Sequence, residues 1–459
     1  MSVNESNTIQ YTVTTSRVTD GTTLYWKTTG NTTNSDIVGG NTGSITVTNN
    51  QAIFNITLIA DETADGTKTL GIALLTGSLS GTQVTTTAAP IVINDTSNTA
   101  PPAYVIYSWG YNNRGQLGQN DRVTRSSPVQ IGSETGWSPL SGQLSADGTN
   151  RGNMAIKTNG TLWGWGSNPY GNLGTNDAVY RSSPVQIGAG TTWSQVNSHM
   201  TVTIATKTDG TLWTWGRNND GQLGHGGSVY RSSPTQVGTA TNWDKVATGL
   251  HSMATKTDGT LWAWGNNYYG QLGQNDRTYR NSPLQVGTAT NWILVVNGDT
   301  NTTATKTDGT LWSWGDNSSG QLGQNDTTNR SSPTQIGTAT NWNKFSSSST
   351  HNIATKTDGT LWLWGFGSGL LAFNDTNYQR NSPTQVGSTT NWNQVSAGTK
   401  HSMATKTDGT LWAWGRNSEY GELGTNDRVS KSSPIQIGVA ANWSLVSAGG
   451  YTSTAIAVI

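Results

Sequence analysis

The chain of 459 residues contains no cysteine, which excludes disulfide bonds and thiolate metal sites but leaves the cellular compartment open. Charged residues make up only 11% of the sequence, and acidic and basic side chains balance to a formal net charge of zero. No run of basic residues is present, so nucleic-acid binding through the phosphates has no electrostatic basis.

Long apolar runs are also missing. No stretch approaches the roughly 18 residues that a membrane helix needs, so we expect no membrane insertion. The N-terminal sequence MSVNESNTIQYTV has neither the basic nor the apolar region of a secretory signal. The composition is typical of an extracellular protein, although no export signal is visible.

Tryptophan, in contrast, is abundant, with 21 residues, and one motif that contains it recurs along most of the chain. The motif reads KTDGTLWAWG at residues 256–265 and continues as GQLG at residues 270–273. Its closing Trp-Gly step occurs seven times, at Trp109, Trp165, Trp215, Trp264, Trp314, Trp364 and Trp414. The spacings are 56, 50, 49, 50, 50 and 50 residues, and a fixed period near fifty predicts a propeller or a solenoid.

Each repeat predicts about four short strands. Residues 251–265 read as a hairpin with Asp258-Gly259 at its turn, because glycine readily adopts the positive φ that such turns need. A polar loop follows, and then the segment LQVGTATNWILVV supplies another short strand pair. Four strands per repeat is the arrangement of a β-propeller blade.

The two ends of the array predict a closed ring. The first unit starts in the middle of a blade, at residues 104–110, and the last unit stops at residues 451–459, which align with the first hairpin strand. Pairing of 104–110 with 451–459 in one blade gives each end what it lacks and leaves no open edge. We therefore expect an all-β protein in which residues 104–459 form a seven-bladed propeller.

Residues 1–97 carry no such repeat. Alternating apolar residues and Gly- and Asn-rich turns predict a small antiparallel β-sandwich that serves as an attachment domain. The expected strands fall at residues 9–13, 23–27, 45–47, 54–58, 69–75 and 84–93. Residues 98–103 contain two prolines and are predicted to be a linker.

The repeats resemble those of the regulator of chromosome condensation family, through the motif W-G-x-N-x-x-G-Q-L-G. The motif stands at residues 109–118, 215–224, 264–273 and 314–323. The resemblance implies a seven-bladed propeller. The family includes a nucleotide-exchange factor and chromatin binders, but this chain lacks a basic tail and a singular acidic patch. The sixth unit departs from the motif at residues 369–372 and the third unit at residues 225–227, so we expect reshaped loops there.

Residues 44–95 resemble a Calx-beta-type sandwich of the kind found in phage structural proteins, through SITVTNNQAIFNITLIADETADGTKTLGIALL and IVINDTS. The resemblance implies a calcium site at clustered carboxylates. The candidates are Asp61, Glu62, Asp65 and Asp95. However, Lys68 stands where an acidic residue is usual, and calcium favours several carboxylates. We therefore interpret these acids as solvated turn residues and expect no metal site.

Three histidines occupy equivalent positions in three repeats, with Asn301 and Tyr451 aligned to them in two others. They are His251, His351 and His401. A metal site needs ligands that converge at about 2.0 to 2.1 Å, and equivalent positions on blades are scattered around an axis. We expect these histidines to be structural.

Aspartate and arginine recur four residues apart in the polar loops. The pairs are Asp121 with Arg125, Asp177 with Arg181, Asp276 with Arg280 and Asp326 with Arg330. Because a catalytic centre would occur once, we interpret them as ion pairs that hold each loop. No nucleophile with its base, and no phosphate-binding glycine loop, has a diagnostic spacing. We expect neither catalytic residues nor cofactors, and no enzymatic activity.

The segments that vary between these near-identical repeats are the loops after each Trp-Gly step. Aromatic residues enter them at Tyr111, Tyr170, Tyr268, Tyr269, Phe366 and Tyr420. Aromatic faces on a rigid scaffold suit the binding of a glycan or a protein, because they give contact area at low entropic cost. The competing interpretation is that these loops vary because nothing constrains them.

These features together predict a non-enzymatic bacteriophage virion protein of the tail, neck, fibre or capsid surface. Virion proteins are released by lysis and need no export signal. We expect residues 1–97 to contact other virion proteins in a homo-oligomeric assembly, built in the host cytoplasm, with the propeller loops binding a host-surface glycan or protein. The alternatives are a secreted or surface adhesin of a bacterium and an intracellular interaction scaffold.

Overall fold

The computed structural model describes the strands within residues 2–94 with residues 47–48, and then residues 102–140, 144–145, 152–199, 201–367, 372–373 and 377–459. Every regular element in these ranges is a β-strand. They belong to two compact units, Met1–Pro102 and Ala103–Ile459. Among the described residues, no helix is long and apolar enough to span a bilayer.

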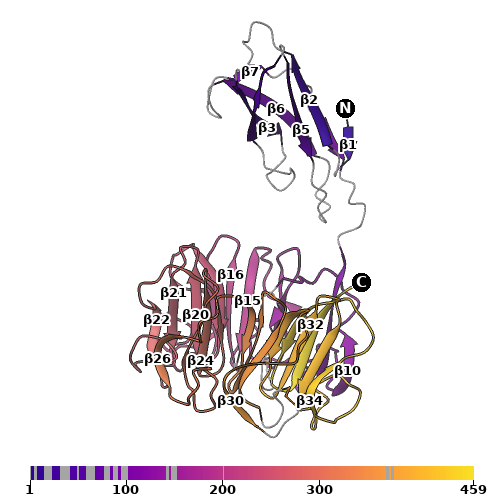
Figure 1. Ribbon diagram of the computed structural model, residues 1–459. Helices are drawn as coiled ribbons and strands as arrows, with labels where there is room; N and C mark the ends of the chain where they lie inside the picture. The colour runs from indigo at the N-terminus through magenta and orange to yellow at the C-terminus, as the bar shows by residue number, and fades with distance from the viewer. Residues whose placement is uncertain are drawn as a thin grey trace. The chain divides into compact units, whose positions relative to one another are not determined.

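The second unit consists of seven four-stranded antiparallel sheets arranged as a ring (Figure 1). This confirms the predicted seven-bladed propeller. Blades 1 to 7 are numbered here in the order of their Trp-Gly steps, from Trp109 to Trp414. The first strands of neighbouring blades contact one another, so these strands surround the axis of the ring.

The strands repeat in the same four places in each blade, in order from the axis outward. The first strands, from blade 2 round to blade 1, are β11 (Leu144–Ser145), β15 (Trp193–His199), β19 (Trp243–Thr248), β23 (Trp292–Asn297), β27 (Trp342–Ser347), β31 (Trp392–Ala397) and β35 (Trp443–Ala448). The second strands are β12 (Asn153–Ile156), β16 (Val202–Lys207), β20 (His251–Lys256), β24 (Asn301–Lys306), β28 (His351–Lys356), β32 (His401–Lys406) and β36 (Thr452–Val458).

The third and fourth strands complete each blade. The third strands, from blade 1 to blade 7, are β9 (Tyr104–Gly110), β13 (Leu162–Gly166), β17 (Leu212–Gly216), β21 (Leu261–Gly265), β25 (Leu311–Gly315), β29 (Leu361–Phe366) and β33 (Leu411–Gly415). The fourth strands are β10 (Arg125–Gln130), β14 (Arg181–Gln186), β18 (Arg231–Gln236), β22 (Arg280–Gln285), β26 (Arg330–Gln335), β30 (Gln379–Gln385) and β34 (Lys431–Gln436).

Blade 1 is assembled from both ends of this unit. Its strand order is β10-β9-β36-β35, and β9 pairs with β36 along the whole of both strands. The register runs from Thr452 opposite Gly110 to Val458 opposite Tyr104. The ring therefore closes through a ladder of backbone hydrogen bonds between the first and the last propeller strand.

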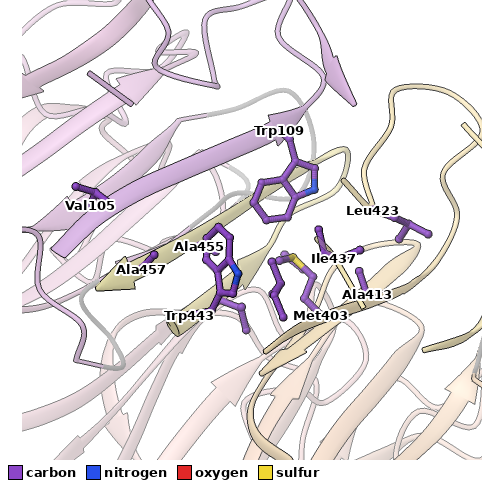
Figure 2. Close-up of a cluster of buried hydrophobic side chains, with 12 residues drawn as sticks. Val105, Trp109, Met403, Ala413, Leu423, Ile437, Trp443, Ala455 and Ala457 are labelled. Carbon is purple, nitrogen blue, oxygen red and sulfur yellow. The ribbon is translucent and has the colours of Figure 1, made fainter. Parts of the chain in front are cut away.

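The hydrophobic core lies between neighbouring blades. Figure 2 shows the cluster between blade 7 and blade 1, where Trp109 and Trp443 face Met403 and Leu423. All four side chains are at most 9% exposed. Comparable clusters recur around the ring, so each blade is stabilised by apolar surface that it buries against its neighbours.

A KTDG turn connects the second and third strands in blades 3 to 7, as blade 4 illustrates. Gly259 adopts a φ of +77° at the turn, and Asp258 Oδ1 accepts hydrogen bonds from Thr260 N and Oγ1 at 3.0 and 2.6 Å. Lys256 Nζ lies 4.7 and 4.2 Å from the ring centroids of Trp243 and Trp262. The motif thus combines a turn with a cation held between two aromatic rings.

The first unit contains eight strands in two sheets, and these are also drawn in Figure 1. They are β1 (Ser2–Asn4), β2 (Thr8–Thr14), β3 (Thr23–Gly30), β4 (Thr42–Thr46), β5 (Gln51–Thr57), β6 (Lys68–Thr76), β7 (Gln83–Thr85) and β8 (Ile91–Asn94). One sheet has the order β1-β8-β6-β3-β4 with β7 beside β6, and β2 pairs with β5 in the other. Buried Leu24 and Val47 pack with Ile45.

Two sequence predictions for this unit were wrong in detail. The single strand expected over residues 84–93 is two separate strands, β7 and β8. The expected arrangement was antiparallel throughout, but β1 and β8 pair in parallel. A parallel pair cannot be connected by a tight hairpin, so local turn signals did not reveal it.

Candidate functional site

The residue that follows each Trp-Gly step varies between blades and lies at one end of the propeller axis. These residues are Tyr111, Ser167, Arg217, Asn266, Asp316, Phe366 and Arg416. In blades 1 and 3 to 7 the backbone N–H of this residue donates to the turn between the first two strands. The accepting carbonyls are those of Tyr451, Thr201, Leu250, Thr300, Thr350 and Lys400, at 2.8 to 3.2 Å. We call these residues together the variable ring.

The turns that accept hydrogen bonds from the variable ring belong to segments that approach one another near the axis. His199 Nε2, at the end of β15 in blade 3, lies 3.2 Å from Asp299 Oδ1, in the turn after β23 in blade 5. Side chains from non-adjacent blades therefore meet here, and a ligand on this face would contact several blades at once.

The six aromatic candidates do not form a single site. Phe366 belongs to the variable ring and is 37% exposed. Tyr170 packs against Tyr230, with ring centroids 5.5 Å apart, while Tyr268 and Tyr269 contact each other at 4.8 Å. These aromatic residues lie on separate blades.

Tyr111 and Tyr420 do come together, at the junction of blades 1 and 7. Their ring centroids are 4.2 Å apart, and Tyr420 is also 5.4 Å from Tyr451. Tyr451 was not among the aromatic candidates, because its sequence alignment placed it with the histidines. That alignment was wrong by one residue: Thr452, like His251, stands opposite the glycine of the Trp-Gly step.

The three equivalent histidines are buried at the contacts between blades. Nε2 of His251, His351 and His401 lies 2.7 to 3.0 Å from a hydroxyl in the next blade, that of Thr302, Ser402 and Ser453 respectively. Burial lowers the pKa of His251 and His401 to about 3 and that of His351 to about 4. The imidazoles are therefore neutral and join neighbouring blades.

The four Asp–Arg pairs are ion pairs within single loops, with N–O distances of 2.5 to 2.6 Å. A fifth pair, Asp427 with Lys431 at 3.1 Å, occupies the same place in blade 7. The hydrogen bond from Arg330 holds the pKa of Asp326 below its ordinary value. In blade 3, Gly227 stands in the aspartate's place, and Asn218 Nδ2 donates directly to its carbonyl at 2.8 Å.

A buried asparagine fixes the loop that follows the Trp-Gly step in six blades. These residues are Asn112, Asn168, Asn218, Asn267, Asn317 and Asn417, all at most 1% exposed. Each Oδ1 accepts from the backbone N–H of the leucine in the GQLG motif at 2.8 to 2.9 Å. The sequence signal was present as the N of W-G-x-N, and blade 6 has Gly367 instead.

A cavity of about 510 Å³ lies where blade 6 meets blade 7, beside the variable ring. Its lining includes Phe366 from blade 6 together with Lys400 and Arg416 from blade 7. The remaining wall is formed by hydroxyl-bearing residues, by Gly367 and by the buried His351 and His401. No acidic residue is part of the described lining, and Lys400 is exposed.

The calcium candidates Asp61, Glu62, Asp65 and Asp95 lie outside the described residues, so that interpretation stays a prediction. Within the part of the chain that is described, no three His, Cys, Asp or Glu side chains gather to hold a metal ion.

Seven blades with Trp-Gly at the end of the third strand, six of which have a GQLG-type loop that contacts the next blade, define a class of propeller. The chain belongs to the RCC1-like domain family, which it matches over residues 106–386, more than half of its length. Residues 392–422 and 408–456 match the regulator of chromosome condensation (RCC1) repeat. The resemblance inferred from the repeats is thereby confirmed for the propeller.

Several known proteins are similar to this chain. A probable E3 ubiquitin-protein ligase of Homo sapiens, HERC6, is 38% identical over 88 residues, which are 18% of this chain and 8% of the ligase. Prp20p from Saccharomyces cerevisiae is 21% identical with a TM-score of 0.68, covering 78% of this chain and 92% of Prp20p. Human WBSCR16 is 19% identical with a TM-score of 0.67, covering 77% and 99%. At these identities the solved structures show the fold alone.

Proposed function

We propose that this protein is a non-enzymatic binding module that contacts its target through the variable ring. The observation that carries the proposal is the contrast between constant and variable positions. Buried Trp, Asn and Leu residues repeat from blade to blade, whereas the variable ring carries Tyr, Ser, Arg, Asn, Asp and Phe. Phe366 is exposed, Ser167 and Asp316 are buried, and the other members are half-buried. A rigid scaffold with a varied rim is suited to recognition.

The absence of enzymatic activity is supported by how the reactive residues are used. The histidines are bonded between blades and the aspartates to arginine or lysine within their loops. Among the described residues, these pairs repeat around the ring and are not brought to one centre.

We further propose that the module is part of a bacteriophage particle, with residues 1–97 as an attachment domain of Calx-beta-like sandwich type. This part of the proposal rests on the sequence: low charge, no cysteine, and Thr- and Asn-rich strands. A bacterial adhesin and an intracellular scaffold are the alternatives. Prp20p is described with binding properties to Gsp1p and histones, so a protein target fits this fold as well as a glycan.

Purified particles from the source of the gene test the virion role. We expect the chain in their mass spectrum, and electron cryo-microscopy to show several copies at a symmetric position with the variable ring accessible. Particles without the chain would overturn the virion role. A chain on the bacterial surface would then support the adhesin, and a soluble complex in the host would support the scaffold.

A further inference from the structure

The contact between blades 6 and 7 differs from the other six contacts between blades. In each of those six, an indole Nε1 donates to the carbonyl of the second residue of the preceding GQLG-type loop, for example Trp109 to Glu422 at 2.8 Å and Trp364 to Gln321 at 2.9 Å. At the seventh contact the indole of Trp414 is fully buried, and no described residue accepts from it.

A second hydrogen bond follows the same pattern. At the other six contacts a Ser, Thr or Asn side chain donates to that same carbonyl, as Ser453 does to Glu422 at 2.7 Å and Thr302 to Gln271 at 2.9 Å. The corresponding Ser402 bonds His351 at 3.0 Å, and the described residues include no such carbonyl partner for it. Ser402 lines the cavity.

The sequence of blade 6 accounts for this difference. Gly367 replaces the buried asparagine that fixes the loop elsewhere. Ala372 stands where the other loops end in glycine and adopts a φ of +69°, a conformation that costs an alanine but not a glycine. The described residues Gly367 and Ala372 therefore distinguish blade 6 from the other blades, and Gly367 lines the cavity.

The chemistry of the cavity favours an acidic ligand. Within the described part of the chain, Lys400 and Arg416 are the only charged residues that line the cavity. The buried His351 and His401 in the lining are neutral. Arg416 also pairs with Glu419, whereas Lys400 has no ion pair among the described residues. Ser418, Ser430 and Ser402 offer hydroxyl groups, and exposed Phe366 offers an aromatic face.

We propose that this cavity binds an acidic saccharide, with its carboxylate at Lys400 and Arg416 and a sugar ring against Phe366. The inference rests on the proposed binding function and names its ligand class. A volume of about 510 Å³ lies within the range of small-ligand sites. Hydroxyl donors with one aromatic face match a sugar, whereas an extended peptide needs a free sheet edge or a long groove.

Calorimetric titration of the full chain with trigalacturonic acid, 3′-sialyllactose and their methyl esters tests the proposal. The esters keep the shape and remove the charge. We expect at least one acid to bind and its ester to bind at least tenfold more weakly. Equal binding of acid and ester, or no binding of either acid, would overturn the proposal.

The residues at equivalent positions of other blades provide conservative substitutions for the cavity residues. Lys400→Thr copies Thr350, and Arg416→Asn and Phe366→Asn copy Asn266 of blade 4. We expect each to weaken the acid at least fivefold, with thermal unfolding unchanged. Arg277→Thr copies Thr327 of blade 5 at an exposed loop position outside both the variable ring and the cavity, and serves as the control that keeps full affinity. Variants that all retain wild-type affinity would place the ligand elsewhere and refute the assignment.

The virion role and the saccharide site can be refuted independently of each other. A chain that is present in purified particles but binds neither acid would refute the saccharide site and leave the virion role intact. A chain that binds the acid but is missing from particles would do the reverse.

Discussion

The indole Nε1 of Trp109, in strand β9, donates a hydrogen bond of 2.8 Å to the carbonyl oxygen of Glu422, which lies 313 residues later in the chain. This bond joins blade 1 to blade 7, whereas the pairing of β9 with β36 completes blade 1 itself. The same indole-to-carbonyl bond at five other contacts between blades makes its contribution measurable by comparison.

Trp109→Phe removes this donor and leaves a buried carbonyl without one of its partners. Trp414→Phe removes a similar volume, but its indole has no partner among the described residues. We expect Trp109→Phe to lower the free energy of unfolding by about 1 to 2 kcal/mol more than Trp414→Phe does, the net worth of a buried hydrogen bond. Chemical denaturation of both variants measures the difference, and equal losses would contradict it.

Stability is expected to fall as the pH drops from 7 toward 4. The pKa of His251 and His401 is about 3 and that of His351 about 4 in the folded protein, against 6.5 for the ordinary group. The unfolded chain therefore binds protons first, and the stability present above pH 6.5 is lost as the pH falls below it, by up to about 1.4 kcal/mol per pH unit for each histidine.

Replacing the three histidines with asparagine, the residue that blade 5 has at Asn301, tests the origin of this pH dependence. We expect the melting temperature of the triple variant to change less between pH 7 and pH 4.5 than that of the parent. An unchanged slope would assign the acid sensitivity to carboxylates instead.

Lys256→Met should destabilise blade 4. The substitution keeps the apolar stem but removes the charge that lies 4.2 Å from the Trp262 ring centroid and 4.7 Å from that of Trp243. A cation over an aromatic face is worth about 0.5 to 2 kcal/mol, so we expect a loss in that range. Lys344→Met is the control, because no ring contact is found for that lysine. Urea denaturation at two salt concentrations measures the loss.

Ala372→Gly and Gly273→Ala should act in opposite directions at equivalent loop positions. Ala372 adopts a φ of +69°, so glycine relieves backbone strain and should stabilise by roughly 0.5 to 1 kcal/mol. At Gly273, with a φ of +71°, a Cβ atom would lie 2.9 Å from Trp314 Nε1, so alanine should destabilise by more than 1 kcal/mol. Thermal unfolding of the two variants decides the sign of each effect.

Much of the propeller could be predicted because short local sequence motifs determine the turns and strands of a blade, and these motifs repeat. Asp258-Gly259 predicted a hairpin turn, and Gly259 has the positive φ that this turn requires. The alignment of Tyr451 with the histidines failed because it matched side chains, whereas the position is set by the backbone register that pairs Thr452 with Gly110. The first unit was harder to predict, since its parallel pair joins strands from opposite ends of that unit.

The candidate site was less accessible to sequence reasoning. The aromatic residues of the variable loops were visible, but those on different blades are held apart by the ring, with Tyr111 and Tyr420 the exception. Lys400 sits in a turn and Arg416 follows a Trp-Gly step, so no local motif joins them to Phe366. Their proximity arises from the packing of blade 6 against blade 7, and the signal in the sequence was the missing asparagine at Gly367.

Closure of the ring by β36 also determines when the protein can finish folding. During synthesis β9 emerges before the other propeller strands, yet its partner along one edge consists of residues 452–458, which form the last propeller strand to be made. Until then β9 presents unpaired backbone groups, the kind of edge that recruits strands from other chains. A chain that stops before residue 452 would keep that edge. Synthesis of β36 is thus a condition for a monomeric propeller, and ribosomes that stall before this strand would yield aggregation-prone products.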